Sequence, residues 1–269
     1  MGIDHLTRHL NELFSMAESH YIKIRRGHEE EAIHQLRVSL KKVNAVFKLV
    51  AYVAPQSFNA RLAFGPLKEI FDLSGAVRDL QIAHQVLCQY QMAYNQNIQK
   101  SISDELVLAI GKLLEWKKRK PNGELFVLVG SSTQRLKSIN QARLLKGSVG
   151  YIDRLLQNIE FLMSSKKKDK WHRIRISLKR IRFVMDCALN MKMVFASPEE
   201  YKMVRLVGKL LGDWHDRVIA VAKIRSHATE STNAMEIKDD KELLKKIGRD
   251  RRSLLAASRF YLRALLANR

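Results

Sequence analysis

The chain has 269 residues, 46% of them apolar, which is enough for one large domain or two small ones with a sizeable core. Four Pro, twelve Gly and no sustained alternation of polar and apolar residues exclude a β-rich protein and favour an all-α chain. The formal net charge of +21 at pH 7 favours a polyanionic partner, and nucleic acid, an anionic membrane surface and polyphosphate all fit that charge.

The cellular environment is the next expectation. Cys88 and Cys187 are isolated thiols, so no disulfide framework is indicated and a reducing compartment fits. No run approaches the ~18 apolar residues of a membrane-spanning helix, and the first residues contain no apolar signal core. We therefore expect a cytoplasmic protein that does not insert into membranes.

In chain order, apolar periodicity and helix-breaking residues predict ten helices in a single domain, 1–269. Gly75 and Gly212 are read as breaks between helices, and Asp79 as an N-cap. Pro121 and Gly123 mark the boundary between a first half, 1–123, and a second half, 124–269. The predicted helices are 3–25, 29–53, 57–73, 79–97, 103–118, 148–165, 169–194, 198–211, 214–228 and 239–267.

The most informative segment is the helix predicted over 169–194. Residues 166–182 contain nine Lys or Arg and a single acid. At helical pitch, an apolar stripe covers one side, and a row of cations at i, i+3, i+7 and i+10 covers an arc of roughly 80° on the other. Such a row suits an extended polyanion, although an ordinary solvated helix face is the alternative. The row consists of His172, Arg175, Lys179 and Arg182.

The same pattern occurs earlier in the chain. At an offset of 138, His34, Arg37 and Lys41 match His172, Arg175 and Lys179. At an offset of 137, the segment 73–79 matches 210–216, so that Arg78 corresponds to His215. Two ordered matches at nearly one offset indicate an internal duplication, and a merely solvated face would not need it.

This doubled pattern carries a family resemblance. His-x-x-Arg-x-x-x-Lys/Arg-Lys/Arg followed by Leu-x-Gly-x-x-Arg/His-Asp resembles the CHAD family, the conserved-histidine α-helical domain, over nearly the whole chain. The resemblance implies two pseudo-two-fold-related helical bundles and binding of inorganic polyphosphate by the basic residues around the two histidines. Two positions depart from an even pattern. Asn44 stands where the second copy has Arg182, and Asp186 stands opposite Lys48.

We expect the two rows to face a shared basic groove or channel. The histidines either contact the ligand, which we favour, or make structural hydrogen bonds. Ligand contact predicts tighter binding as pH falls through about 6.5. The expected polyphosphate-binding residues are His34, Arg37, Lys41, Lys42, Lys48, Lys68, Arg78, His172, Arg175, Lys179, Arg180, Arg182, Arg205, Lys209 and His215.

The function expected from these residues is binding, with the protein placed on polyphosphate stores or serving as an accessory module. No phosphate-cradling Gly-rich loop, Cys-x-x-Cys pair or nucleophile elbow is present, and acids are scarce near the two rows. We therefore expect no catalytic residue, no metal and no cofactor. Two alternatives stay open: a nonspecific nucleic-acid-binding protein and a metal-dependent phosphohydrolase. Few aromatic residues lie near the cations to stack bases, with Trp171 and Phe183 the nearest.

Overall fold

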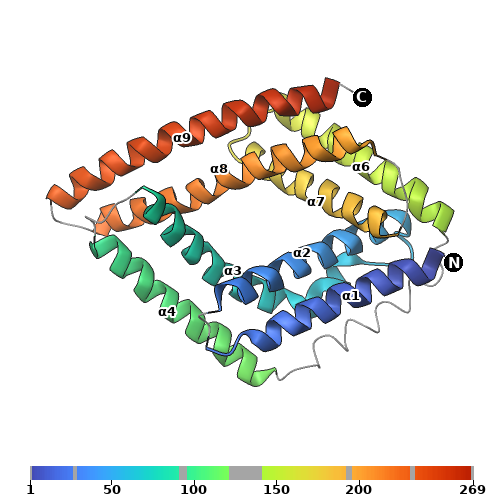
Figure 1. Cartoon of the computed structure of the whole chain (residues 1–269), viewed down its shortest axis with the longest axis horizontal. Coiled ribbons are helices and arrows are strands. Elements are labelled where there is room, and N and C mark those ends of the chain that lie inside the picture. The colour runs from blue at the N-terminus through green and yellow to red at the C-terminus, as the bar shows by residue number, and fades with distance from the viewer. Residues whose placement is uncertain are drawn as a thin grey trace.

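The computed structural model describes residues 2–26, 29–90, 96–120, 141–191, 196–230 and 234–267. Every regular element in these residues is an α-helix, which confirms the all-α prediction (Figure 1). The helices are α1 (Gly2–Lys23), α2 (Glu30–Val53), α3 (Ala60–Gln89), α4 (Gln96–Arg119), α6 (Gln141–Ser164), α7 (Lys170–Asn190), α8 (Pro198–Glu230) and α9 (Ala234–Ala267).

The described residues form eight helices where the sequence analysis expected ten, because two predicted breaks are wrong. In place of the helices expected over 57–73 and 79–97 there is the continuous α3, which ends at Gln89, and those expected over 198–211 and 214–228 form the continuous α8. A glycine inside a helix costs only about 1 kcal/mol relative to alanine, and packing overrides a penalty of that size. The boundary expected at residues 121–123 lies outside the described residues.

The predicted cap of a separate helix at Asp79 is also wrong, since Asp79 lies in the interior of α3. The N-cap of α3 is Asn59. Its side-chain oxygen accepts hydrogen bonds from the backbone N–H groups of Arg61 at 3.0 Å and Leu62 at 3.2 Å, which satisfies two of the free donors at the helix start. Asp216, its counterpart, likewise lies inside α8. Both carboxylates are therefore available to side chains rather than to helix ends.

The central helices α2 and α7 bury the apolar stripes that the sequence predicts. Each fully buried Leu, Ile, Val or Phe stabilises the fold by about 1.5–3 kcal/mol, so these stripes fix how both helices are rotated. Their cation-bearing flanks therefore point away from the core. The stripes, 0–2% exposed, are Leu36, Leu40, Val43 and Phe47 on α2, and Ile174, Leu178, Ile181 and Met185 on α7.

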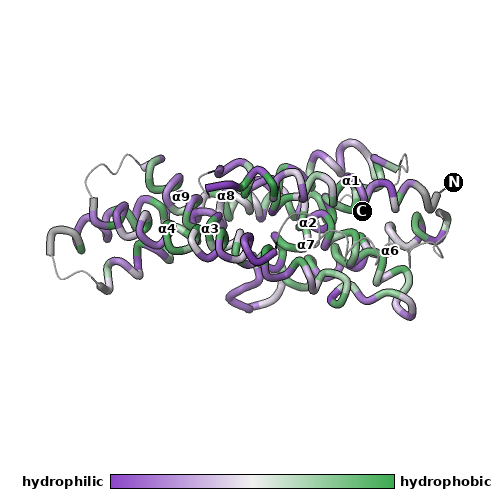
Figure 2. Tube along the Cα trace, turned by 90° about the horizontal axis from the view of Figure 1, so that it is seen from below, coloured by the Kyte–Doolittle hydropathy of each residue, from purple (hydrophilic) through white to green (hydrophobic). Residues whose placement is uncertain are grey.

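The helices form an elongated, flat assembly (Figures 1 and 2). α2 packs against α7 in the middle, α1 covers α2, and α6 packs against both α2 and α7. A large apolar core lies among these helices and the adjoining parts of α3 and α8. A second, smaller core joins α3, α4, α8 and α9 and contains Leu80, Leu87, Ile98, Ile224 and Leu243.

Hydrogen bonds also connect the outer helices to their neighbours. Lys117 of α4 donates to carbonyl oxygens at the end of α1, including that of Tyr21 at 2.7 Å, where helix carbonyls lack intrahelical partners. At the C-terminal end of α3, the Tyr90 hydroxyl donates to Asp250 of α9 and accepts from Nε of Arg217 of α8 at 3.1 Å. In the described part of the chain, no helix has the length and apolar character needed to cross a membrane.

Candidate functional site

A cleft of about 420 Å³ lies between α2, α3, α7 and α8. This volume is typical of ligand-binding pockets. Its polar lining is dominated by basic residues: seven Lys or Arg and two His, against two Asp and one Asn. These residues are Arg37, Lys41, Asn44, Lys48, Arg78, Asp79, His172, Arg175, Lys179, Arg180, His215 and Asp216. The apolar remainder of the lining is Ala45, Phe71, Ile82, Ile176, Phe183 and Ile219.

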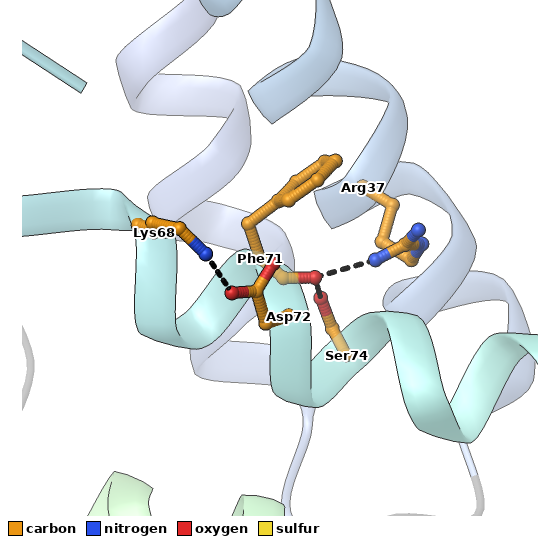
Figure 3. Close-up of polar contacts among 5 residues, drawn as sticks. All are labelled: Arg37, Lys68, Phe71, Asp72 and Ser74. Carbon is orange, nitrogen blue, oxygen red and sulfur yellow. Dashed lines mark hydrogen bonds and ion pairs between the residues drawn. The ribbon is translucent and has the colours of Figure 1, made fainter. Parts of the chain in front are cut away.

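Arg37 is held in place by α3 (Figure 3). Its Nη1 donates to the carbonyl oxygen of Phe71 at 2.6 Å, and its guanidinium carbon lies 4.8 Å from the centre of the Phe71 ring. The Ser74 hydroxyl donates to the same carbonyl at 3.2 Å. Gly75 presents no side chain to the guanidinium, so Arg37 packs directly on the helix. Arg37 is thus pre-organised before any ligand arrives.

Three other nitrogen atoms of the cleft are buried and lack a hydrogen-bond partner among the described residues. They are Nε of Arg78, Nε of Arg175 and Nδ1 of His215. A buried polar atom without a partner is unfavourable by about 1–3 kcal/mol. An oxyanion in the cleft would offer acceptors to the arginine N–H groups. Three unsatisfied buried polar atoms of the described residues therefore belong to the cleft that the cations line.

Burial lowers the pKa values of three cleft lysines, because an ammonium ion loses hydration there. The pKa of Lys179 falls to about 7, with repulsion from Arg175 and then Lys41 adding to the burial effect. The pKa of Lys41 falls to about 8 through burial and neighbouring arginines. The pKa of Lys48 falls to about 8 through burial and the charge of Arg180. An anionic ligand would reverse these shifts.

The pKa values of three histidines at or near the cleft are lowered as well. Burial, followed by the charge of Arg175, lowers the pKa of His215 to about 3 and also lowers the pKa of His172. Burial and Arg78 lower the pKa of His34. The rings of His172 and His215 are 5.0 Å apart between centroids. At neutral pH the free cleft therefore holds neutral histidines, and the lysines are the groups that titrate near neutrality.

The two carboxylates do not assemble a metal site. Burial raises the pKa of Asp216, and Arg175 and Lys179 oppose that effect. Asp79 and Asp216 both favour the charged form of Arg175. Among the described residues, no three His, Cys, Asp or Glu side chains are placed to hold a metal ion together. Asp79 and Asp216 therefore act on the neighbouring cations.

The sequence model of the CHAD domain matches residues 8–225, which include every residue that lines the cleft. The chain belongs to the CHAD family.

Solved structures support the same fold for this CHAD protein. It is similar to the CHAD domain from the plant Ricinus communis, with a TM-score of 0.69 and 19% identity over 99% of this chain and 92% of that one. It is also similar to PptA from Streptomyces chartreusis, with a TM-score of 0.66 and 14% identity over 98% of both chains. Comparison with curated proteins finds no match. At these identities the likeness establishes the fold alone.

The CHAD fold brings nine of the fifteen expected binding residues into the cleft lining. They are Arg37, Lys41, Lys48, Arg78, His172, Arg175, Lys179, Arg180 and His215. Arg78 and His215 project from the interiors of α3 and α8, which continue past Gly75 and Gly212 without a break.

Six expected residues lie outside the lining. His34 is near it, since the charges of Arg78, Lys41 and Lys179 all act on its pKa. Lys42 lies on the side of α2 that faces α1, where its charge acts on His9. Arg182 lies over the Phe183 ring at 5.0 Å and pairs with Asp186 at 3.9 Å.

The other three are on the surface. Lys68 is exposed and forms an ion pair with Asp72 (Figure 3). Arg205 is exposed, with its guanidinium carbon 5.7 Å from the centre of the Tyr201 ring. Lys209 is exposed. Phe71, whose carbonyl and ring hold Arg37, was missed by the sequence analysis, because a backbone acceptor leaves no signal in residue type.

Proposed function

We propose that this CHAD protein binds inorganic polyphosphate in the cleft between α2, α3, α7 and α8. One observation carries the proposal: seven Lys and Arg side chains line the cleft, and none of them forms an ion pair within 4.0 Å in the described structure. Two carboxylates, Asp79 and Asp216, offset only part of this charge, and an excess of partly buried positive charge is unfavourable unless an anion joins it. A polyanion supplies many negatively charged oxygen atoms at once and would compensate this positive charge.

The aromatic residues near the cleft favour a chain without bases. Single-stranded nucleic acids bind by stacking bases on exposed aromatic faces. The Phe71 ring is covered by Arg37, and Phe183 and Trp171 are only 6% and 7% exposed. Arg259 and Lys170 also lie over the Trp171 ring, at 5.7 and 5.9 Å. The cations can thus contact phosphate, while the neighbouring rings offer no open platform for a base.

We also propose that the two halves arose by internal duplication and share the ligand. Four pairs related by the sequence offsets line the cleft together: Arg37 with Arg175, Lys41 with Lys179, Arg78 with His215, and Asp79 with Asp216. They come from α2 with α7 and from α3 with α8. This pairing supports a pseudo-two-fold arrangement around the cleft. The sharing is uneven, because Arg37 is anchored and Nε of Arg175 has no partner.

In the cell, such a protein would be a binding module rather than an enzyme. Its role would be to bring the chain to polyphosphate stores in the cytoplasm, or to hold polyphosphate for a partner that acts on it. The lining contains two carboxylates, and both lie close to arginines. This arrangement favours neutralisation of ligand charge over assembly of a phosphoryl-transfer centre.

A competition experiment tests the proposal. Fluorescent single-stranded RNA is bound to the protein at near-physiological salt, and long-chain polyphosphate, short oligophosphates and duplex DNA are added at equal phosphate concentration. We expect long polyphosphate to displace the RNA, and short chains to do so less well because they make fewer simultaneous contacts. If RNA keeps its place against excess polyphosphate, the nucleic-acid alternative should replace the proposal.

A further inference from the structure

A row of side chains leads out of the cleft along α2 to α6. Lys41 and Lys48 line the cleft from one flank of α2, and Tyr52 follows one turn after Lys48, a rise of about 6 Å. The Tyr52 ring packs against Tyr151 of α6, with 5.3 Å between the ring centroids. The guanidinium carbon of Arg154, also on α6, lies 5.8 Å from the centre of the Tyr52 ring. A cation outside the cleft lining therefore ends a row that starts inside it.

Two glycines allow α6 to lie this close to α2. Gly147 and Gly150 share a face of α6 with Arg154, since they precede it by seven and four residues. A Cβ atom at Gly150 would lie 3.2 Å from the hydroxyl oxygen of Tyr52, and one at Gly147 would overlap Cγ2 of Val53. The position of Arg154 over Tyr52 is therefore set by the packing of the two helices.

The cations at this end of the cleft have no counterion among the described residues. Lys48, Arg154 and Arg180 form no hydrogen bond or ion pair there. Burial and then the charge of Arg180 lower the pKa of Lys48, so these two groups of the lining lie close together. The charges of Arg180 and Arg154 both act on Tyr151, whose pKa is raised by burial. Positive charge thus continues from the lining to Arg154, which is exposed.

The equivalent position on α7 has the opposite charge. At the offset of 138, Asp186 of α7 matches Lys48 of α2. Asp186 pairs with Arg182 at 3.9 Å and accepts a hydrogen bond from the Tyr201 hydroxyl at 2.6 Å. Neither Arg182 nor Asp186 lines the cleft. Because an acid repels a polyanion and offsets the arginine beside it, the two related sides of the cleft are not equivalent for a chain that leaves it.

We propose that a polyphosphate chain longer than the cleft leaves it on the α6 side, and that Arg154 forms an outer phosphate-binding subsite reached past Lys48 and Arg180. A guanidinium group binds phosphate oxygens in a bidentate manner. The Tyr52 ring orients this guanidinium and leaves its charge uncompensated. The inference rests on the proposed polyphosphate function. It adds to that function a direction for the chain and one binding residue that the cleft does not contain.

The test compares Arg154→Gln with the parent by isothermal titration calorimetry, using tripolyphosphate and long-chain polyphosphate at near-physiological salt. Tripolyphosphate fits within the cleft, so it should bind both proteins equally. Long chains should bind Arg154→Gln at least threefold more weakly than the parent, and the slope of log affinity against log salt should fall by about 0.7 for the lost contact. Equal affinities for long chains would overturn the outer subsite. An equal loss for both ligands would do the same, because it would place the effect of Arg154 inside the cleft.

Arg8→Gln is the matched control for the direction of the chain. Arg8 is exposed on α1 next to His9, on which the charge of Asp186 acts. The variant makes the same chemical change on the Asp186 side, so it should bind both ligands like the parent. A loss of long-chain affinity as large as that of Arg154→Gln would show that general surface charge controls binding, and would overturn the α6 route.

The parent protein separates this inference from the function on which it rests. If the parent binds neither tripolyphosphate nor long chains, the proposed polyphosphate function fails and the route fails with it. If the parent binds long chains and Arg154→Gln binds them with the same affinity, the function stands and only the route over α6 fails.

Discussion

The guanidinium of Arg37 occupies the space that a side chain at Gly75 would need. A Cβ atom at Gly75 would lie 2.7 Å from Nη1 of Arg37, closer than side-chain carbons approach other atoms. That same Nη1 donates to the Phe71 carbonyl one helical turn away. Gly212, the residue at the matching position of α8, has nothing within 4 Å of its Cβ position.

This relationship predicts that Gly75→Ala weakens polyphosphate binding by about two- to tenfold. The added methyl group displaces the flexible end of Arg37, which loses its contact with Phe71 and its fixed position. Re-ordering such a side chain on binding costs about 0.5–1.5 kcal/mol. Isothermal titration calorimetry with long-chain polyphosphate measures the change, and circular dichroism checks that helix content is retained.

Gly212→Ala is the matched control. It makes the same chemical change in an equivalent helix where nothing obstructs the methyl group. It should leave binding unchanged and raise the free energy of unfolding by about 0.5–1 kcal/mol, the usual gain from alanine in a helix interior. Equal affinities for the Gly75→Ala variant and the parent would show that the fixed position of Arg37 does not matter for binding.

Periodicity in the sequence predicted the buried faces of α2 and α7, because a helix that packs on a core must repeat its apolar residues at helical pitch. Since Leu36 and Ile174 face the core, Arg37 and Arg175 had to lie to one side of it. The repeated pattern then indicated that both flanks belong to one site. These inferences depend only on local rules, and the structure places both arginines in the cleft.

The sequence analysis failed where tertiary contacts override local signals. Gly75 was read as a helix break, although its role in the structure is to admit the Arg37 guanidinium from another helix. Lys68, one of the residues expected to bind polyphosphate, lies exposed outside the cleft lining and forms an ion pair with Asp72. Burial also moves the pKa of Lys179 below that of a free lysine, and no sequence pattern reports burial of a cation.

Cleft and surface cations should differ in their contribution to binding. Arg175→Gln with Lys179→Gln removes two positive charges from the lining, and Lys68→Gln with Lys209→Gln removes two from exposed positions. We expect the first pair to weaken polyphosphate binding at least tenfold, because in the proposed complex both groups would contact the ligand. The second pair should change affinity less than threefold.

The salt dependence of binding separates these variants further. By analogy with single-stranded nucleic acid, each lost phosphate contact reduces the slope of log affinity against log salt by about 0.7. The cleft variant should therefore lose about 1.4 from the slope, while the surface variant keeps the parent's slope. Titrations at four salt concentrations measure it. Equal losses of slope in both variants would mean that polyphosphate binds the general basic surface rather than the cleft.

The cleft lysines should also make the free protein less stable as pH falls. The pKa of Lys179 is about 7 in the folded state and about 10.4 in an unfolded chain, so the unfolded state binds more protons between these values. The penalty is fully present below pH 7 and disappears as pH rises toward 10.4. We expect Lys179→Met to raise Tm at pH 6.5 by about 2–4 °C for each kcal/mol of penalty removed.

That gain should shrink at pH 9.5, where the parent's lysine is largely neutral when folded. Thermal unfolding of both proteins at the two pH values tests this expectation, with Lys209→Met as a control that removes an exposed lysine. A Tm difference between Lys179→Met and the parent that does not change with pH would contradict the depressed pKa of Lys179.

Polyphosphate binding should weaken as pH rises from 6.5 to 9. Bound phosphate stabilises the charged forms of Lys179 and Lys41, so their pKa values rise on binding from about 7 and about 8. Between the free and bound pKa values each lysine takes up a proton when the ligand binds, and affinity falls by up to tenfold per pH unit for each proton.

In Lys179→Arg the charge persists throughout this range. That variant should bind more tightly than the parent at pH 9 and show a shallower pH dependence, whereas His34→Ala with His172→Ala should keep the parent's slope above pH 7. Affinities measured at half-unit pH steps decide between the two groups. If the double histidine variant loses the pH dependence and Lys179→Arg keeps it, the pH effect comes from His34 and His172 instead of the lysines.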